Sequence, residues 1–305
     1  MKVSVCITLL NEEKSIGKLL ESLSKQTKLP DEVVIVDGGS TDNTIKIIKS
    51  FKKGKLNINL FVVKNASRSK GRNVSVAKSK NEITAIMDAD CAADKYWLER
   101  ITKPFEKSDV MMVAGFYKMV ANTPFQKALA PFLGVTADKF KKDFLPSTRS
   151  IAFTKTLWKE VGGFPETNGN TAEDTIFNYK VVKNKSKIVR AKNAVVYWEV
   201  PDDLGVALKK FYNYAKWDAE YGIWWHPTQK FRTHNLKVLT IFLRYAFFLI
   251  FGWFFFLLYL LWAIYKLRKS VREWNARIYV VIIQVASDFA IMAGFLSGIW
   301  VTQNK

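Results

Sequence analysis

Short apolar runs alternate with amphipathic stretches through roughly the first 90 residues of the chain. The apolar runs, which we interpret as buried strands, are residues 2–10, 33–37, 58–63 and 83–88. Between them, apolar side chains recur at helical spacing, which predicts helices at residues 12–26, 42–52 and 68–80. Strand–helix alternation with apolar strands is typical of a mainly parallel sheet that helices cover on both faces. The sequence therefore predicts an α/β fold.

The pattern is less regular after residue 121, where we expect loops with helical pieces up to residue 142. Beyond that region the predicted strands are residues 150–154 and 188–197. The predicted helices are residues 155–161 and 173–184, with a loop at 162–171 between them. We therefore expect one α/β domain over residues 1–202.

A predicted amphipathic helix follows at residues 203–225, rich in tyrosine and tryptophan and with lysines alongside. Aromatic residues beside basic ones favour a helix that lies in a membrane interface. A surface helix packed on the domain is the alternative. We assign residues 203–235 as an amphipathic interfacial segment.

Two later segments, at about 245–265 and 278–301, are apolar enough to cross a bilayer, which needs about 20 apolar residues. We therefore expect a membrane domain over residues 236–305 with two transmembrane helices. Gln284, Ser287 and Asp288 interrupt the second segment. A charged side chain is costly in lipid, so Asp288 is expected to face protein.

The formal net charge of +20 calls for an anionic partner. Nucleic acid is not expected, because the lysines are spread over many helices and no nucleic-acid-binding motif is present. An anionic membrane surface fits better, since each basic residue near it gains about 1 kcal/mol. The basic loop 266–277 would lie opposite the α/β domain if both segments cross fully, against the positive-inside tendency. Flanking basic residues offset this only in part: Lys230, Arg232, Lys237 and Arg244.

The first apolar run is too short for a signal peptide, which places the α/β domain in the cytosol. Cys6 and Cys91 lie in or beside apolar strands without metal-ligand spacing, as is typical of reduced structural thiols. The expected location is the cell membrane, as a multi-pass protein with its α/β domain on the cytoplasmic face.

The strand at 83–88 carries the most informative chemistry, because it leads into Asp88 and Asp90. Side chains two residues apart point to the same side of a strand, so these carboxylates can converge past its end. Two close carboxylates repel each other unless a cation sits beside them. Mg²⁺ and Mn²⁺ suit such oxygen ligands and often carry substrate phosphates as well. A solvated acidic turn is the alternative.

Other polar residues fall at the same edge of the predicted sheet, where ligands bind in α/β folds. Asp37 ends the second strand and opens the turn 37–42. A purely structural turn would need the glycines and the helix cap of this segment, but it would not need Asp37. Arg68 and Arg72 lie on the third helix, and arginine suits a diphosphate by forked hydrogen bonding. Solvated helix charges are the alternative for both arginines.

Taken together, these motifs resemble family 2 glycosyltransferases with the GT-A fold. The matching motifs are Asn11-Glu12, the turn 37–42, Gly71-Arg72-Asn73, Asp88-Ala89-Asp90, the run 161–166 and Glu173-Asp174. They occur in the family's order from residue 1 to about residue 221.

The resemblance implies a role for each matching residue. Nucleotide binding is implied for Thr8, Asn11, Glu12, Asp37, Arg68, Arg72 and Asp88. Metal binding is implied for Asp90 with Asp88, the cofactor being Mn²⁺ or Mg²⁺. The acidic pair Glu173-Asp174 would be catalytic, with Asp174 as the base, and the acceptor side is assigned to Gly163, Phe164 and Glu166. Such a pair can also simply favour a helix N-terminus.

Two departures from the family pattern matter. Members often place a histidine metal ligand after the late strand, where this chain reads Tyr197-Trp198-Glu199, so Glu199 is only a candidate third ligand. The chain also lacks the Gln-x-x-Arg-Trp signature of processive polymerases. A single sugar transfer is therefore expected, and His226 and His234 are interpreted as interfacial rather than metal-bound.

The leading hypothesis is a membrane-attached, inverting hexosyltransferase. It would use a nucleotide-diphosphate sugar and a lipid-linked acceptor, either a lipid-linked glycan or a polyprenyl phosphate. A sugar-phosphate nucleotidylyltransferase is disfavoured because no Gly-rich loop follows the first strand. The other alternative is a non-catalytic membrane protein that binds a nucleotide sugar or a glycan. The sequence does not indicate the oligomeric state.

Overall fold

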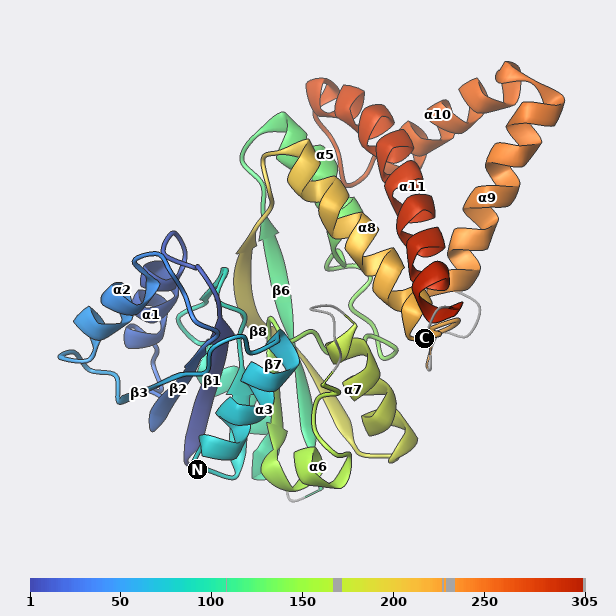
Figure 1. Ribbon diagram of the computed structural model, residues 1–305. Coiled ribbons are helices and arrows are strands. Elements are labelled where there is room, and N and C mark those ends of the chain that lie inside the picture. The colour runs from blue at the N-terminus through green and yellow to red at the C-terminus, as the bar shows by residue number, and fades with distance from the viewer. Residues whose placement is uncertain (108, 167–171, 227, 229–233, 304–305) are drawn as a thin grey trace. The chain divides into compact units, whose positions relative to one another are not determined.

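The computed structural model describes residues 1–107, 109–166, 172–226, 228 and 234–303 (Figure 1). The chain divides into two compact units. The first comprises Met1–Lys118 and Ala137–Glu199, and the second Met119–Thr136 and Val200–Lys305. The expected boundary at residue 202 is therefore close, but Met119–Thr136 groups with the C-terminal unit instead of the α/β domain.

An eight-stranded sheet forms the centre of the first unit, in the order β3-β2-β1-β4-β7-β6-β8-β5. Its strands are β1 (Val3–Leu9), β2 (Glu32–Asp37), β3 (Ile58–Val62), β4 (Ile83–Ile86), β5 (Cys91–Ala93), β6 (Met112–Val120), β7 (Ile151–Thr154) and β8 (Ile188–Glu199). Strands β1 to β4 are mutually parallel, whereas β7 runs antiparallel to β4 and β6 antiparallel to β7. The predicted α/β fold is confirmed.

The helices of this unit are α1 (Ile16–Ser24), α2 (Thr44–Phe51), α3 (Arg68–Lys78), α4 (Trp97–Thr102), α6 (Lys155–Glu160) and α7 (Glu173–Lys183). Helix α1 illustrates why these helices form. Its apolar residues recur at helical spacing and make one face that is fully buried: Ile16, Leu19, Leu20 and Leu23. The sequence analysis left residues 91–120 unassigned. Strand β5 pairs with β8 about a hundred residues later, which a local pattern does not reveal.

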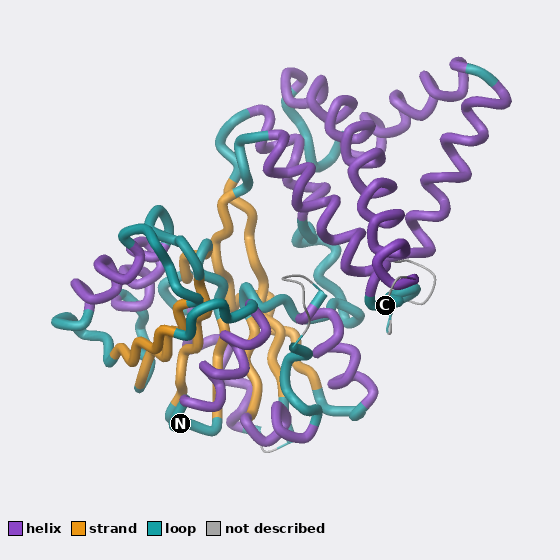
Figure 2. The backbone as a smooth tube through the Cα atoms, viewed as in Figure 1, coloured by secondary structure: helices purple, strands orange, loops and turns teal. Residues whose placement is uncertain are grey.

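From residue 200 onward the described residues of the second unit form helices joined by loops (Figure 2). It contains α5 (Pro124–Leu133), α8 (Leu204–Glu220), α9 (His234–Phe251), α10 (Trp253–Leu267) and α11 (Trp274–Gln303). Helices α9 and α11 are long and apolar enough to cross a membrane, by length and composition only. The predicted helix at 278–301 lies inside α11.

The predicted single helix at 245–265 is wrong. The chain breaks at Gly252, whose φ of +96° is a backbone conformation that side chains other than glycine rarely adopt, and the segment is shared between α9 and α10. The surrounding residues are uniformly apolar, so hydrophobicity alone does not reveal the break.

Helix α8 packs along α11 within the second unit, and the interfacial assignment of residues 203–235 stays a prediction. A Cβ atom built on Gly294 would lie 2.2 Å from the carbonyl oxygen of Tyr212. One built on Gly298 would lie 2.2 Å from that of Lys216. The two backbones are thus in direct contact, as small-residue pairs four apart allow. Lys230 and Arg232 lie outside the described residues, as does part of the predicted loop 162–171.

This contact predicts the effect of Gly298→Ala. The added methyl group meets backbone, which cannot rotate away, so the helices must separate at a cost of about 1–3 kcal/mol in the free energy of unfolding. Thermal unfolding in detergent, followed by circular dichroism, measures the loss. Ala293→Leu enlarges an exposed position of the same helix and serves as the control. Equal stability of Gly298→Ala and wild type would contradict the packing.

Candidate active site

The loops after β1 and β2 are joined by hydrogen bonds. Asn11 has a left-handed φ of 55°, its backbone N–H donates to the Ser40 hydroxyl at 2.8 Å, and its side-chain oxygen accepts from the Thr41 N–H at 2.9 Å. The Glu12 N–H donates to the Thr44 hydroxyl at 2.8 Å. Thr8 lies directly against α3 at Gly71. The nucleotide-binding candidates of this edge are therefore joined into one surface by hydrogen bonds and packing.

Asp37 is fully buried and stabilises the turn that follows it. One of its oxygens accepts the N–H groups of Gly39 at 2.8 Å and Ser40 at 2.7 Å, and the other accepts the Ser40 hydroxyl at 2.6 Å. The expectation that the turn does not need Asp37 is therefore wrong. Any role of Asp37 toward a ligand comes in addition to this structural one.

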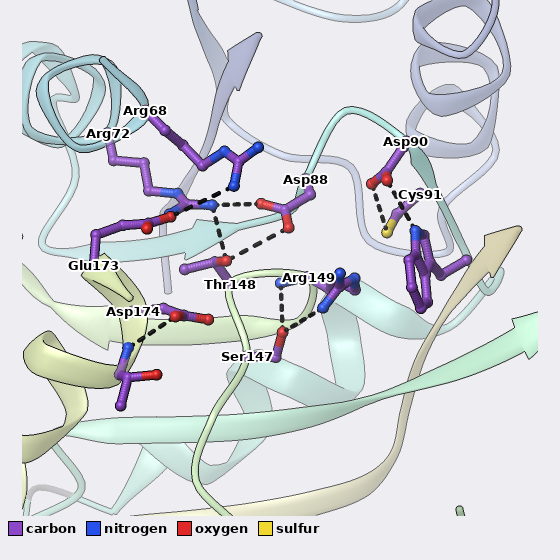
Figure 3. A network of polar contacts seen from close by, with 12 residues as sticks. Arg68, Arg72, Asp88, Asp90, Cys91, Ser147, Thr148, Arg149, Glu173 and Asp174 are labelled. Carbon is purple, nitrogen blue, oxygen red and sulfur yellow. Dashed lines mark hydrogen bonds and ion pairs between the residues drawn. The ribbon is translucent and has the colours of Figure 1, made fainter. Parts of the chain in front are cut away.

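Arg72 is the centre of the site (Figure 3). Its side chain is 2% exposed and projects from α3 between two acids. One terminal nitrogen donates to Asp88 at 2.8 Å and to the Thr148 hydroxyl at 2.9 Å. The other donates to Glu173 at 2.5 Å, and the guanidinium lies 5.7 Å from the centre of the Phe164 ring. One buried cation thus joins the end of β4, the start of α7 and the loop before β7.

The two acids that pair with Arg72 have pKa values shifted in opposite directions. Burial tends to raise the pKa of Asp88, but the charges of Arg72, Arg149 and Arg68 outweigh it and hold that pKa below its ordinary value. For Glu173 burial prevails, and its pKa is raised although Arg72 opposes the rise. Asp88 is therefore the firmly ionised partner.

Asp90 lies in the same neighbourhood (Figure 3). It accepts a hydrogen bond from the indole N–H of Trp198 at 2.8 Å, and Arg149 stacks over that indole ring at 4.1 Å. Burial raises the pKa of Glu12, and the negative charges of Asp90 and Asp88 add to the rise. Three carboxylates of the predicted site are thus close enough to influence one another.

The sequence analysis missed Thr148, Arg149 and the contact made by Trp198. Thr148 and Arg149 reach the site because β7 pairs with β4, placing Ile151 opposite Ile86, so the residues before one strand lie beside those after the other. The only local signal was a polar turn ahead of a short apolar strand.

The carboxylates fit a divalent metal held jointly by protein and substrate. Mg²⁺ is usually bound by one or two carboxylates, with water and substrate phosphates completing its shell. Asp90 and Asp88 can fill that role, since each carboxylate offers about four lone-pair positions. Within the described ranges, no group of three His, Cys, Asp or Glu residues is arranged to hold a metal.

The candidate third ligand Glu199 does not join this group. Its neighbour Trp198 points inward, and alternate residues of a strand face opposite sides. Glu199 is largely exposed and forms an ion pair with Lys18. The indole of Trp198 cannot replace it, because its nitrogen only donates hydrogen bonds.

The acidic pair divides between two roles. Glu173 is 2% exposed and forms ion pairs with Arg72 and, at 3.8 Å, Arg68. Asp174 is half-buried, and its oxygen accepts the neighbouring Thr175 N–H at 2.8 Å. Of the two, Asp174 has the carboxylate that a reacting group can reach, whereas Glu173 holds Arg72.

The three residues predicted for the acceptor side differ in exposure. Phe164 is 1% exposed and stacks on Phe177 with ring centres 4.2 Å apart, so the prediction that it faces an acceptor is wrong. Gly163 is also buried, against Trp158 and Asn73. Only Glu166 is exposed, 3.4 Å from the Asn73 amide nitrogen.

The shared cation predicts how Arg72→Gln behaves. Asp88 has a lowered pKa, so its contribution to stability is present at neutral pH and is lost as pH falls through the folded-state pKa. Without Arg72, two buried carboxylates lack their cation, and the free energy of unfolding at about pH 7 falls by about 3–5 kcal/mol. The deficit shrinks toward about pH 4, because protonation removes the uncompensated charges.

Urea unfolding across that pH range measures the difference. Arg68→Gln is the matched control, since Arg68 is 47% exposed and its ion pair with Glu173 is longer; we expect a loss below about 1 kcal/mol. A deficit of Arg72→Gln that does not change with pH would rule out the charge argument.

Comparison with known proteins identifies the family of the chain. The family described as "Glycosyl transferase family 2" matches residues 4–160. Glycosyltransferase AglE of Haloferax volcanii is 34% identical over 116 residues, covering 37% of this chain and 38% of the relative. Poly(ribitol-phosphate) beta-N-acetylglucosaminyltransferase TarS of Staphylococcus aureus is 30% identical over 206 residues, covering 65% and 35%. The chain thus spans little more than a third of the length of these relatives.

Solved structures support the fold. The TarS 1–349 structure in complex with UDP-GlcNAc has a TM-score of 0.57 at 21% identity, covering 100% of this chain and 92% of that one. The mannosyltransferase PcManGT from Pyrobaculum calidifontis, in complex with GDP-Man and Mn²⁺, has a TM-score of 0.56 at 21% identity, covering 70% and 62%. Because the family match covers about half of the 305 residues, the chain belongs to glycosyl transferase family 2.

Proposed function

We propose that the protein is an inverting glycosyltransferase that moves one sugar from a nucleotide-diphosphate sugar to a lipid-linked acceptor. The observation that carries the proposal is the cluster around Arg72, where Asp88 is held ionised beside Asp90 and an accessible Asp174 (Figure 3). Arginines and carboxylates at the carboxyl ends of parallel strands suit a charged donor bound at that edge. TarS and PcManGT, which share the fold, hold UDP-GlcNAc and GDP-Man.

The donor would lie along the edge formed by the loops after β1, β2 and β4. Asn11 and Asp37 would contact the nucleoside, although both already stabilise the turn between them. Arg68 would reach the diphosphate, because its side chain is half-exposed at the start of α3. Asp90 with Asp88 would hold Mn²⁺ or Mg²⁺, which supplies Lewis-acid stabilisation of the leaving diphosphate when bound.

Asp174 would act as the general base. Transfer with inversion requires the acceptor hydroxyl to attack the anomeric carbon from the side opposite the leaving nucleotide, losing its proton as it does so. The Asp174 carboxylate is half-buried, and among the described residues it forms no ion pair with a basic side chain. Glu166, at the exposed end of the same region, is the remaining acceptor-side candidate.

The acceptor is proposed to be lipid-linked because the C-terminal unit carries many large exposed apolar side chains. Leu243 is 70% exposed, Leu249 88% and Trp253 74%. Attachment to the cytoplasmic face of the cell membrane would cover these side chains and give the net charge of +20 an anionic partner. A lipid-linked glycan and a polyprenyl phosphate both fit this proposal.

A panel of nucleotide sugars, each incubated with the purified protein and a membrane lipid extract, tests the proposal. We expect one donor to label the lipid fraction and Asp90→Ala to abolish the transfer. Binding of a donor without transfer to any lipid, water or glycan would support the alternative, a protein that only binds nucleotide sugars.

Asp174→Asn distinguishes the two acceptor classes. If a hydroxyl attacks, the variant binds donor normally but turns over about 10²-fold more slowly or worse, the scale of losing a general base. Glu160→Gln, on an exposed carboxylate of α6 that has no proposed role in the site, is the control for the loss of one negative charge. A polyprenyl phosphate is already ionised and needs no base. Turnover of Asp174→Asn close to wild type would therefore reject the base assignment and favour the phosphate.

A further inference from the structure

Helices α9 and α10 form a hairpin whose tip is wholly apolar. Phe247 packs on Phe255 with ring centres 5.0 Å apart, and Phe248 packs on Phe256 at 5.7 Å, so the two helices meet at a corner around Gly252 and diverge from it (Figure 1). The tip, defined as residues 249–255, has the sequence Leu-Ile-Phe-Gly-Trp-Phe-Phe. Leu249 is 88% exposed and Ile250 74%. An apolar patch of this size is unfavourable in water and is typical of a surface that binds a membrane or another protein.

The hairpin has no polar end that could emerge beyond a bilayer. No charged residue occurs between Arg244 and Lys266, and the turn at Gly252 lies in the middle of that stretch. A pair of crossing helices would need a polar turn on the far side. At the turn the Gly252 N–H donates to the Phe248 carbonyl at 3.0 Å, which satisfies that backbone donor without water.

Both open ends of the hairpin are basic. Lys237 lies in the first turn of α9, Lys266 lies in the last turn of α10, and Arg268, Lys269 and Arg272 follow it. Arg244, deeper in α9, forms an ion pair with Asp288 at 3.7 Å and does not belong to this basic surface. Trp262 and Tyr265 lie near that end, 47% and 61% exposed. Aromatic and basic residues together mark the headgroup region of a membrane, so both ends fit the same anionic surface.

Helix α11 fixes the base of the hairpin. Asp288 is 2% exposed and accepts hydrogen bonds from Tyr259 at 2.5 Å and Tyr245 at 3.2 Å. The expectation that Asp288 faces protein is confirmed, and its partners come from both α9 and α10. The carboxylate therefore holds both helices against α11 at a point seven residues from Gly252 on each helix.

The packing of α11 also argues against its crossing the bilayer. Gly294 and Gly298 lie on the backbone of α8, and α8 carries Lys209, Lys210, Lys216, Asp218 and Glu220. If α11 crossed the membrane, these charges would enter the hydrocarbon with it, at a cost of several kcal/mol.

We propose that residues 249–255 insert into one leaflet of an anionic membrane and that none of α9, α10 and α11 crosses it. This inference rests on the membrane attachment in the proposed function, and it replaces the expected two spans. It also removes the conflict with the positive-inside tendency, because the basic loop 266–277 returns to the side of the catalytic unit.

Single cysteines in the full-length protein test the topology in cells. Lys46→Cys marks the first unit, Ser270→Cys the basic loop and Ile250→Cys the tip. The natural thiols give little background, since Cys6 and Cys91 are buried and burial raises the pKa of Cys6 to about 12. A membrane-impermeant maleimide should label Lys46→Cys and Ser270→Cys only in inverted vesicles, and Ile250→Cys only after detergent is added.

Labelling of Ser270→Cys from outside intact cells would overturn the one-leaflet arrangement and leave the proposed function standing. A wild-type protein found free of membranes would instead contradict the membrane attachment itself. As a second measurement, Ile250→Lys with Trp253→Lys should lower binding to anionic liposomes by roughly 10²-fold or more. Leu29→Lys replaces another exposed leucine, in the first unit, and should bind like wild type. Unchanged binding of the tip variant would also overturn the proposal.

Discussion

The buried guanidinium of Arg72 is the contact on which the site depends. It joins Asp88 after β4, Glu173 at the start of α7 and Thr148 before β7, three segments that are distant in sequence. Fork-shaped hydrogen bonding suits arginine to this task, and lysine could not satisfy two acids and a hydroxyl in one plane. Because a buried charge without its partner is costly, each of these segments constrains the other two. The arrangement of the carboxylates is therefore set before any ligand binds.

In that arrangement, neighbouring carboxylates have different roles. Glu173 neutralises Arg72 from within, and Asp174, the next residue, keeps a carboxylate within reach of solvent. Asp88 forms an ion pair with Arg72. Among the described residues, Asp90 accepts hydrogen bonds only from the indole N–H of Trp198 and, at a longer distance, from the Cys91 thiol. Asp90 thus has more of its capacity free for a metal than Asp88 does. Trp198, in the region where family members often carry a histidine ligand, orients that carboxylate.

Local pattern was enough to predict the parallel strands, their helices and the edge at which the polar residues gather. Residues in the order of the family's motifs then identified Arg72, Asp88 and Asp90. What failed depended on long-range packing. Thr148 and Arg149 reach the site only through the pairing of β7 with β4. Phe164 was predicted to lie on the acceptor side but is a core residue. Glu199 is the last residue of β8, and its side chain is exposed and pairs with Lys18. Gly252 breaks a uniformly apolar run with a single backbone angle.

Calorimetric titration of the purified protein with UDP- and GDP-sugars, with and without Mn²⁺, tests the preformed donor site most directly. The account predicts that one of these donors binds and that its affinity falls at least roughly tenfold when Mn²⁺ is withdrawn or when Asp90 is replaced by Asn, the scale of losing one charge-assisted contact. Glu199→Gln should bind like wild type. Donor binding that keeps its full affinity and its response to Mn²⁺ in Asp90→Asn would contradict the account.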